Sequence, residues 1–416
     1  MPSMLVLIFA TLLASQQAIQ PIATPGTARL QVFLDCNDCF ADYLREETTF
    51  VDYVRDRTEA DVHIIITNVG TGSGGREYVL AFTGERRFAG NNQSLKAITG
   101  TGDPDDVRRQ QLLTTLRIGL LQYLAAGGAP QQLEVNVKLA AAAKGDVAPR
   151  RDRWDHWVFS LRASAAANGE ESSKEQEFSG AFSADRITPD WKLTFGAELD
   201  RETEEFDLDE DDPVKVSRRE TDFNWLMVKS LGEHWSAGAT GEVRSSTFDN
   251  IEMRVAAAPA IEFNLFPYSA YQRRQLRTNY AVGLGRQSYY EETIFGKLEE
   301  TLPAHELSVN YSQTERWGSV EGEVEWFQYL NDLSKSRLEA NAELSWRIVR
   351  GLSVSAEGNA SRIRDQISLR GRGATPEEIL LRLRELQSGY EYGFSMSVTY
   401  TFGSIFSSIV NPRFGQ

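Results

Sequence analysis

The sequence predicts an α+β protein, in which a small N-terminal α/β domain precedes an antiparallel transmembrane β-barrel of about 12 strands. Helix-like and strand-like apolar patterns alternate up to residue 139. Beyond residue 154 the pattern of the sequence changes. Short segments there alternate apolar and polar side chains, and no helical pattern interrupts them for a long way. A mean hydropathy of −0.38 excludes a helical membrane protein, but it is compatible with a barrel, whose inner face is polar.

Composition excludes several classes of function. The chain has 416 residues, with 59 acidic and 44 basic side chains and a net charge of −15. A negative chain of this kind argues against a general nucleic-acid binder. Two cysteines and four histidines are too few for a disulfide-dense scaffold, a four-cysteine zinc site or a histidine-rich metal centre. We therefore expect no nucleic acid partner, no metal and no cofactor.

Residues 1–24 are expected to be a signal peptide. The apolar run Met4–Ala14 has the length of a signal-peptide core and is too short to span a bilayer as a helix. Pro21 and Pro25 would end any helix that followed. No Lys or Arg precedes the run, which is atypical. A buried N-terminal helix of a cytoplasmic protein is the alternative, and export is favoured because nothing amphipathic accompanies the run.

Residues 25–139 are expected to form the α/β domain, and residues 140–153, with their alanine run and Pro149, the linker. Asp103 is the expected N-cap of the second helix, with Pro104 in its first position and Gly127 at its end. In chain order the predicted elements are a strand at Arg29–Leu34, a helix at Tyr43–Arg55, strands at Val62–Ile66 and Tyr78–Thr83, a helix at Pro104–Tyr123 and a strand at Leu133–Leu139.

Residues 154–403 are expected to form the barrel, and residues 404–416 a C-terminal tail. The sharpest alternation is Gly393–Phe402, in which apolar and small polar side chains occupy opposite faces. Short connections alternate with long ones at 201–218, 287–303 and 365–390, as in outer-membrane barrels. The strands of a soluble β-sandwich also alternate apolar and polar side chains. Here, however, strand after strand carries charged residues on one face, and this favours the barrel. The strands are expected to start near Trp157, Glu177, Trp191, Glu220, Trp235, Arg254, Leu276, Glu306, Ser319, Arg337, Leu352 and Gly393.

From about residue 154 onward the chain resembles the bacterial outer-membrane β-barrel class. The stretch Tyr392–Phe402 is similar to the C-terminal strand that the barrel-assembly machinery recognises, although here further residues follow Phe402. The whole chain also resembles a group of uncharacterised exported bacterial proteins with a small α/β domain before such a barrel. The resemblance implies the bacterial outer membrane as the location, with the N-terminal domain in the periplasm. The implied partners are outer-membrane lipids, the barrel-assembly machinery during biogenesis and, as a further candidate, a periplasmic protein.

Alternation places many charged side chains on the lumen face of the predicted barrel. Opposed charges of this kind would pair across the lumen and narrow or close any pore. The expected lumen charges are Glu321, Glu323, Glu325, Glu339, Glu343 and Glu357, together with Arg162, Arg244, Arg254, Arg277, Arg337 and Arg347.

Cys36 and Cys39 lie between a predicted strand and a predicted helix, where a redox-active pair would sit because a helix N-terminus lowers a thiol pKa. The thioredoxin family pattern has a Trp before the first cysteine and usually a Pro between the two. Here Leu34-Asp35 precedes the pair and Asn37-Asp38 separates it. In an oxidising periplasm we therefore expect a structural disulfide.

Three other motifs favour non-catalytic interpretations. Gly70–Gly75 precedes a strand, so a hairpin is favoured over a phosphate-binding loop. The acidic run Glu198–Asp212 could bind Ca²⁺ loosely, but it lacks EF-hand spacing and is interpreted as a solvated loop. His305 and Ser308 lack the two-residue spacing of outer-membrane phospholipases. No catalytic set can be assembled, so we do not expect an enzyme.

A short amphipathic helix is predicted in the last long connection. Thr375 is its expected N-cap, Pro376 suits its first position and Glu378 completes a capping box. Ile379, Leu380, Leu383 and Leu386 form an apolar stripe, which we expect to dock into the barrel mouth as a lid, onto a partner or onto the outer leaflet, unless the helix is merely a solvated part of the loop.

These patterns favour an outer-membrane barrel without enzymatic activity. It would serve as a narrow channel, or as an anchor that presents the periplasmic domain to partners. A hydrolase active at the barrel rim and a secretion or assembly component remain the alternatives.

Overall fold

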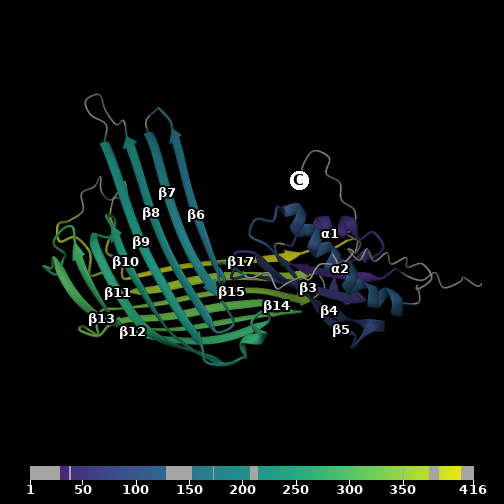
Figure 1. The fold of residues 1–416 in the computed structure, drawn as a ribbon. Helices are drawn as coiled ribbons and strands as arrows, with labels where there is room; N and C mark the ends of the chain where they lie inside the picture. Colours follow the sequence, from purple (N-terminus) through teal and green to yellow (C-terminus); the bar gives the residue numbers. More distant parts are fainter. Residues whose placement is uncertain are drawn as a thin grey trace, which may run out of the picture.

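The computed structural model describes residues 29–36, 39–127, 152–171, 173–206, 214–349, 351–373 and 384–403. These residues form a five-stranded sheet with two α-helices, followed in the chain by a 12-stranded sheet. Figure 1 shows the smaller unit lying beyond the ends of β14, β15 and β17. The predicted linker and the predicted strand Leu133–Leu139 lie outside the described residues.

The N-terminal domain has a mixed sheet with strand order β2-β1-β3-β4-β5. β1 is parallel to both β2 and β3, whereas β3, β4 and β5 are antiparallel neighbours. In chain order the elements are β1 (Gln31–Cys36), α1 (Ala41–Glu47), β2 (Asp52–Tyr53), η1 (Arg57–Glu59), β3 (Val62–Gly70), β4 (Arg76–Gly84), η2 (Arg86–Phe88), β5 (Asn92–Thr99) and α2 (Asp105–Ala126).

The core of this domain lies between α2 and the sheet. Leu112, Leu116 and Leu120 recur at helical spacing and are fully buried. Gly119 lets the helix approach the sheet closely, because a Cβ there would lie 2.0 Å from the ring of Phe82. No helix among the described residues is long and apolar enough to cross a membrane.

Two local predictions are corrected in this domain, and strand β5 is an addition to them. The helix predicted at Tyr43–Arg55 ends at Glu47, because the buried Thr48 hydroxyl bonds to the Leu44 carbonyl and the Tyr53 hydroxyl and starts the turn into β2. Pro104, not Asp103, is the N-cap of α2, and the Asp103 carboxylate accepts a hydrogen bond from the Gly100 N–H instead. Strand β5 was not predicted, because its buried and exposed positions alternate without a run of large apolar residues.

The second sheet contains 12 strands, each antiparallel to its neighbour and in the order of the chain. The predicted strand number and antiparallel arrangement are therefore confirmed. The strands are β6 (Trp157–Gly169), β7 (Ser173–Ile187), β8 (Trp191–Phe206), β9 (Val214–Ser230), β10 (Trp235–Ser246), β11 (Ile251–Asn264), β12 (Arg274–Tyr289), β13 (Glu299–Glu315), β14 (Gly318–Tyr329), β15 (Ser336–Val349), β16 (Leu352–Ile363) and β17 (Tyr390–Tyr400).

Several strands are longer than predicted. β9 and β13 each have 17 residues, whereas about 10 residues suffice to cross a bilayer. The long connections predicted at 201–218 and 287–303 therefore shrink to 207–213 and 290–298, while the connection 364–389 remains long. At the other end of the sheet the connections are 188–190, 231–234, 316–317 and 350–351, with the longer segment 265–273 containing η4 (Tyr268–Ala270).

The predicted closed barrel is not what the structure shows. Among the described residues no hydrogen-bonded ladder joins β6 to β17, so the sheet has two free edges. In Figure 1, β6 to β9 rise away from the remaining strands. Ala163 to Gly169 makes up about half of β6, and such small side chains give an edge few contacts with which to hold a neighbouring strand.

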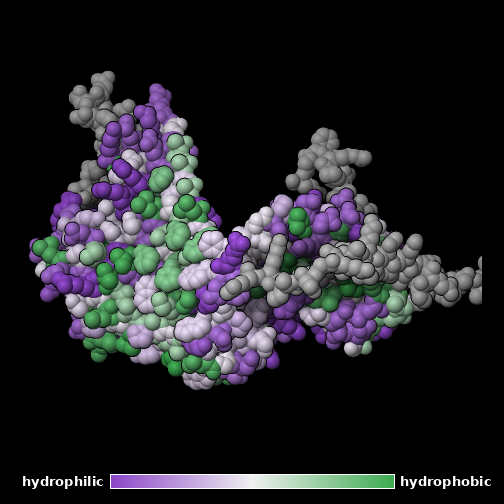
Figure 2. All heavy atoms as spheres, viewed as in Figure 1, coloured by the Kyte–Doolittle hydropathy of each residue, from purple (hydrophilic) through white to green (hydrophobic). Residues whose placement is uncertain are grey.

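The two faces of the sheet differ in character. On β14, Val324 and Trp326 are exposed on one face, whereas Glu323 and Glu325 belong to the opposite, concave face. Figure 2 shows hydrophilic tips on β6 and β7 and more apolar surface below them. This distribution is typical of a sheet whose outer face contacts lipid.

Candidate functional site: the domain junction and the concave face

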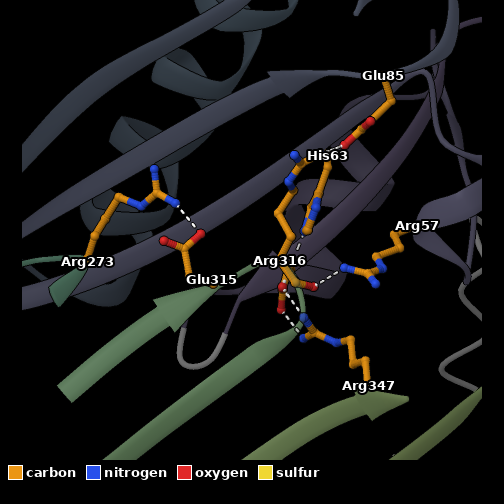
Figure 3. Close-up of polar contacts among 8 residues, drawn as sticks. Arg57, His63, Glu85, Arg273, Glu315, Arg316 and Arg347 are labelled. Atoms are coloured by element: carbon orange, nitrogen blue, oxygen red, sulfur yellow. Dashed lines mark hydrogen bonds and ion pairs between the residues drawn. The ribbon is translucent and has the colours of Figure 1, made fainter. Parts of the chain in front are cut away.

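The N-terminal domain contacts the sheet at the end where the connections are short. Its β3–β4 hairpin, formed by Gly70–Gly75 as predicted, approaches the end of β7. At Gly72 a Cβ would lie 2.5 Å from the Cβ of Ile187, so only glycine fits without a shift. The remaining contacts involve the ends of β12 to β17, and Figure 3 shows several of them.

Asp35 and Arg347 form a more buried ion pair at this junction than Glu85 and Arg316 do. Asp35 lies in β1 and Arg347 near the end of β15. Both terminal nitrogens of the guanidinium donate to the carboxylate, one to each oxygen. The Asp35 side chain is only 15% exposed. A bidentate pair of this kind fixes orientation as well as distance.

His63 supports the same carboxylate from within the domain. Its ring is fully buried in β3, and Nε2 lies 3.3 Å from Oδ2 of Asp35. Burial alone would raise the pKa of Asp35, but the hydrogen bonds to His63 and Arg347 together outweigh it and hold the pKa below the ordinary value of 3.8. Asp35 is therefore ionised at neutral pH.

Further contacts surround this pair. Arg316 in the β13–β14 connection pairs with Glu85, and its carbonyl accepts a hydrogen bond of 2.7 Å from Arg57. The carboxylate of Asp56 accepts a bond of 3.0 Å from the Gly351 N–H, which fastens the domain to the β15–β16 connection. Every short connection from β13 onward thus has a partner in the domain.

Glu77 makes a separate contact with the segment before β12. Its carboxylate accepts hydrogen bonds from Lys96 within the domain, from the Tyr271 hydroxyl at 2.7 Å and from Gln272 at 2.8 Å. The bond from Lys96, followed by that from Tyr271, holds the pKa of Glu77 below its usual value. The charge on Glu77 is thus stabilised by groups from both parts of the molecule.

A cavity of about 360 Å³ lies between the domain and the sheet. Asp35 and Cys36 of the domain line it, together with Tyr271, Glu315 and Arg347 from the large sheet and its connections. Glu315 is held by an ion pair with Arg273 (Figure 3). The cavity is therefore polar and bounded by groups that already have partners.

The structure brings the two cysteines together at the edge of this cavity. Cys36 and Cys39 are joined, with their Cα atoms 6.0 Å apart. Cys39 is 2% exposed and belongs to the core of the domain. The pair thus ties the end of β1 to that core.

Four of the predicted lumen glutamates line a cavity of about 430 Å³ on the concave face: Glu321, Glu323, Glu343 and Glu357. Arg277 lines the same cavity. Glu321, Glu343 and Glu357 stand directly opposite one another on β14, β15 and β16, and Glu325 stands opposite Glu339. The concave face therefore carries rows of like charge, which neighbouring strands normally avoid.

Most of the predicted arginines lie elsewhere on this face. Arg244 pairs with Glu220 and Asp249, and Arg254 pairs with Glu242, each at 2.7 Å. Arg337 pairs with Asp365 and Glu339, and Arg162 lies exposed in β6. Arg347 shares the face of Glu339 and Glu343 by alternation, but it binds Asp35 of the N-terminal domain.

The outer end of the concave face is covered by the start of the connection 364–389. Ile367 packs against Leu302 and Tyr329, and all three are buried. The carbonyl of Ser368 accepts a hydrogen bond of 2.9 Å from the amide of Asn250. Arg370 extends the contact to Glu291 at 3.1 Å. This end of the face is thus packed rather than open.

The remaining predicted site residues are placed as follows. The helix at Thr375, Pro376, Glu378, Ile379, Leu380 and Leu383 lies outside the described residues, and Leu386 is 45% exposed in a non-helical segment. In the acidic run, Glu202 and Glu204 belong to β8 and group with Glu175 of β7. His305 packs against Trp326 on the outer face, whereas Ser308 lies opposite Glu325 on the concave face.

Sequence reasoning missed the junction residues Asp35, His63, Glu85 and Arg316. The available signal was the carboxylate of Asp35 directly after the apolar residues Val32, Phe33 and Leu34. Such a group needs a partner when it is buried, but the sequence does not show that the partner comes from β15.

Comparison with solved structures adds a structural similarity. No protein-family profile matches this sequence, and no curated protein matches it either. Among solved structures, the chain is similar to the β domain of the Bordetella autotransporter Brka, with 14% identity and a TM-score of 0.23 over 59% of this chain and 98% of that one.

Proposed function

We propose that this protein is an outer-membrane β-barrel that serves as an anchor and holds its α/β domain at the periplasmic end. The observation that carries the proposal is that both ends of the concave face are covered. The domain covers one end through Asp35, Glu77 and Glu85, and the segment around Ile367 covers the other. A wide general pore would need both ends open.

The outer-membrane location is supported by the sheet itself. Its strands are long enough to cross a bilayer, and its outer face carries large apolar side chains such as Trp326, Phe394 and Leu161. Backbone groups at a sheet edge cannot remain unpaired in lipid. β6 and β17 run antiparallel, since the sheet has 12 alternating strands, so they could pair and close the barrel.

Fractionation and gel mobility test this proposal. The full-length protein should sediment with outer membranes, and its folded form should migrate differently from the heated form on a denaturing gel. Recovery of the protein as a soluble periplasmic species would contradict the barrel.

A narrow channel is the second candidate, because the concave face retains cavities of about 430 and 470 Å³. Planar-bilayer recordings separate the two functions. The anchor predicts little or no conductance, whereas a small, steady, reproducible conductance would favour the channel.

A further inference from the structure

The cavity at the domain junction continues into the cavity on the concave face. Gln275, Ser312 and Glu321 line both spaces. We call the cavity on the concave face, lined by these residues and by Asn341 and Glu343, the chamber. The way from the chamber to the short-connection end of the sheet therefore leads past Asp35 and Arg347.

We propose that the N-terminal domain is a removable stopper on the chamber, and that the Asp35–Arg347 pair is the latch that keeps it seated. The proposal deepens the proposed function by assigning the domain contact a regulatory role. It rests on the proposed function, because the chamber is enclosed only when β6 pairs with β17 and closes the sheet.

Burial distinguishes this pair from the Glu85–Arg316 pair. The side chains of Asp35 and Arg347 are 15% and 31% exposed, whereas those of Glu85 and Arg316 are 30% and 47% exposed. Exposed ion pairs contribute little to stability. Removing one partner of a buried ion pair, in contrast, leaves the charge of the other partner buried and unpaired. Loss of Arg347 would also leave the carboxylate beside His63 without its cationic partner.

The disulfide keeps the latch in position. Cys36 follows Asp35 directly, and Cys39 is anchored in the domain core. The chain can therefore move little on the C-terminal side of Asp35. A carboxylate held in this way loses less conformational freedom when it binds Arg347.

The rate at which a cysteine in the chamber is labelled tests the stopper. Asn341→Cys places a thiol in the chamber, and the full-length protein in detergent micelles is treated with a polymer-linked maleimide. Cys36 and Cys39 are joined and do not react. Asn341 is exposed in the open sheet described above, so slow labelling is expected only in the closed form in which β6 pairs with β17. In that form the rate should rise at least about fivefold when Arg347→Ala is added, the change that roughly 1 kcal/mol produces in a population ratio.

Three further variants sharpen the test. Arg286→Ala is the matched control, because Arg286 pairs with Glu299 at the far end of the sheet and is 71% exposed. It should leave the labelling rate unchanged. Arg347→Lys keeps the charge without the bidentate geometry and should give an intermediate rate. Asp35→Asn leaves the sheet untouched, so it should open the chamber even if the Arg347 variant does not fold.

Two results would overturn the proposal. One is a rate in Asp35→Asn equal to that of the parent, with the heat-modifiable form still present. The other is a parent rate equal to that of Ser334→Cys, an exposed position in the β14–β15 connection. An open sheet would also give a fast parent rate, so failure of the proposed function is recognised separately, by recovery of soluble protein in fractionation or by the absence of a cross-link between β6 and β17.

Discussion

At the scale of single residues, Asp35 links two parts of the molecule that are far apart in the chain. Its partners are His63, two strands away in sequence order, and Arg347, which is 312 residues further along. A carboxylate between such partners is ionised over most of the pH range. The contact between the domain and the sheet should therefore respond to acid and not to alkali near neutrality.

The pH dependence of stability tests this role. Because the folded-state pKa of Asp35 lies below 3.8, its stabilisation is fully present above that value and is lost as the pH falls through the lower, folded-state pKa. The difference in free energy of unfolding between the wild type and Asp35→Asn, measured by urea titration, should be roughly 3 kcal/mol at neutral pH. It should shrink below about pH 4. An equal difference at neutral and acid pH would contradict the assignment.

Gly119 provides a second prediction at this scale. Gly→Ala inside a helix normally stabilises by about 1 kcal/mol. At Gly119 the new Cβ would meet the ring of Phe82 at 2.0 Å, and overpacking of a core costs about 1–3 kcal/mol. We expect Gly119→Ala to lower stability and Thr114→Ala, at an exposed site on the same helix, to preserve or raise it. Adding Phe82→Leu to Gly119→Ala should recover part of the loss.

At the scale of elements, the regular parts of the fold could be predicted and the irregular parts could not. Alternation over long stretches such as Gly393–Phe402 predicts strands because it follows from the backbone itself. The end of α1 depends on Thr48 contacting Tyr53, which a periodic pattern does not contain. The Asp35–Arg347 contact depends on how two domains meet, and alternation places Arg347 only on the correct face. Among the described residues β6 and β17 do not pair, and the sequence pattern of either strand does not predict this.

The disulfide yields a prediction about β1 and α1. In the loop-entropy account, a bridge that closes a loop this short contributes about 2 kcal/mol. Cys36→Ser combined with Cys39→Ser should speed hydrogen exchange in β1 and α1 of the full-length protein and leave exchange in β12 to β16 nearly unchanged. Wild-type protein treated with a reductant should match the double variant. Equal exchange in all three samples would show that the disulfide does not stabilise the domain.

At the scale of the whole molecule, the two free edges of the large sheet predict its closure in a membrane. Directly opposed residues on neighbouring strands share a face. Leu161 is 84% exposed on the outer face of β6, and Ala163, two residues on, shares that face. On β17 the outer face carries Phe394, Met396 and Val398.

Paired cysteines test the closure. In membrane-inserted protein, Ala163→Cys should form a disulfide with a cysteine at one of the outer-face positions Phe394, Met396 or Val398. It should not do so with one at Ser395 or Ser397, which lie on the concave face. No cross-link at any outer-face position would mean that the two edges do not meet.

The long separation in sequence between Asp35 and Arg347 also determines when their contact can form during biogenesis. A chain is synthesised from its N-terminus, so Asp35 and His63 are made long before Arg347. The guanidinium that pairs with Asp35 is available only after ten strands of the large sheet, β6 to β15, have been made. A docked domain therefore indicates that the large sheet is nearly complete. A truncated or stalled molecule would display a bare carboxylate, which quality-control proteases could distinguish from the finished product.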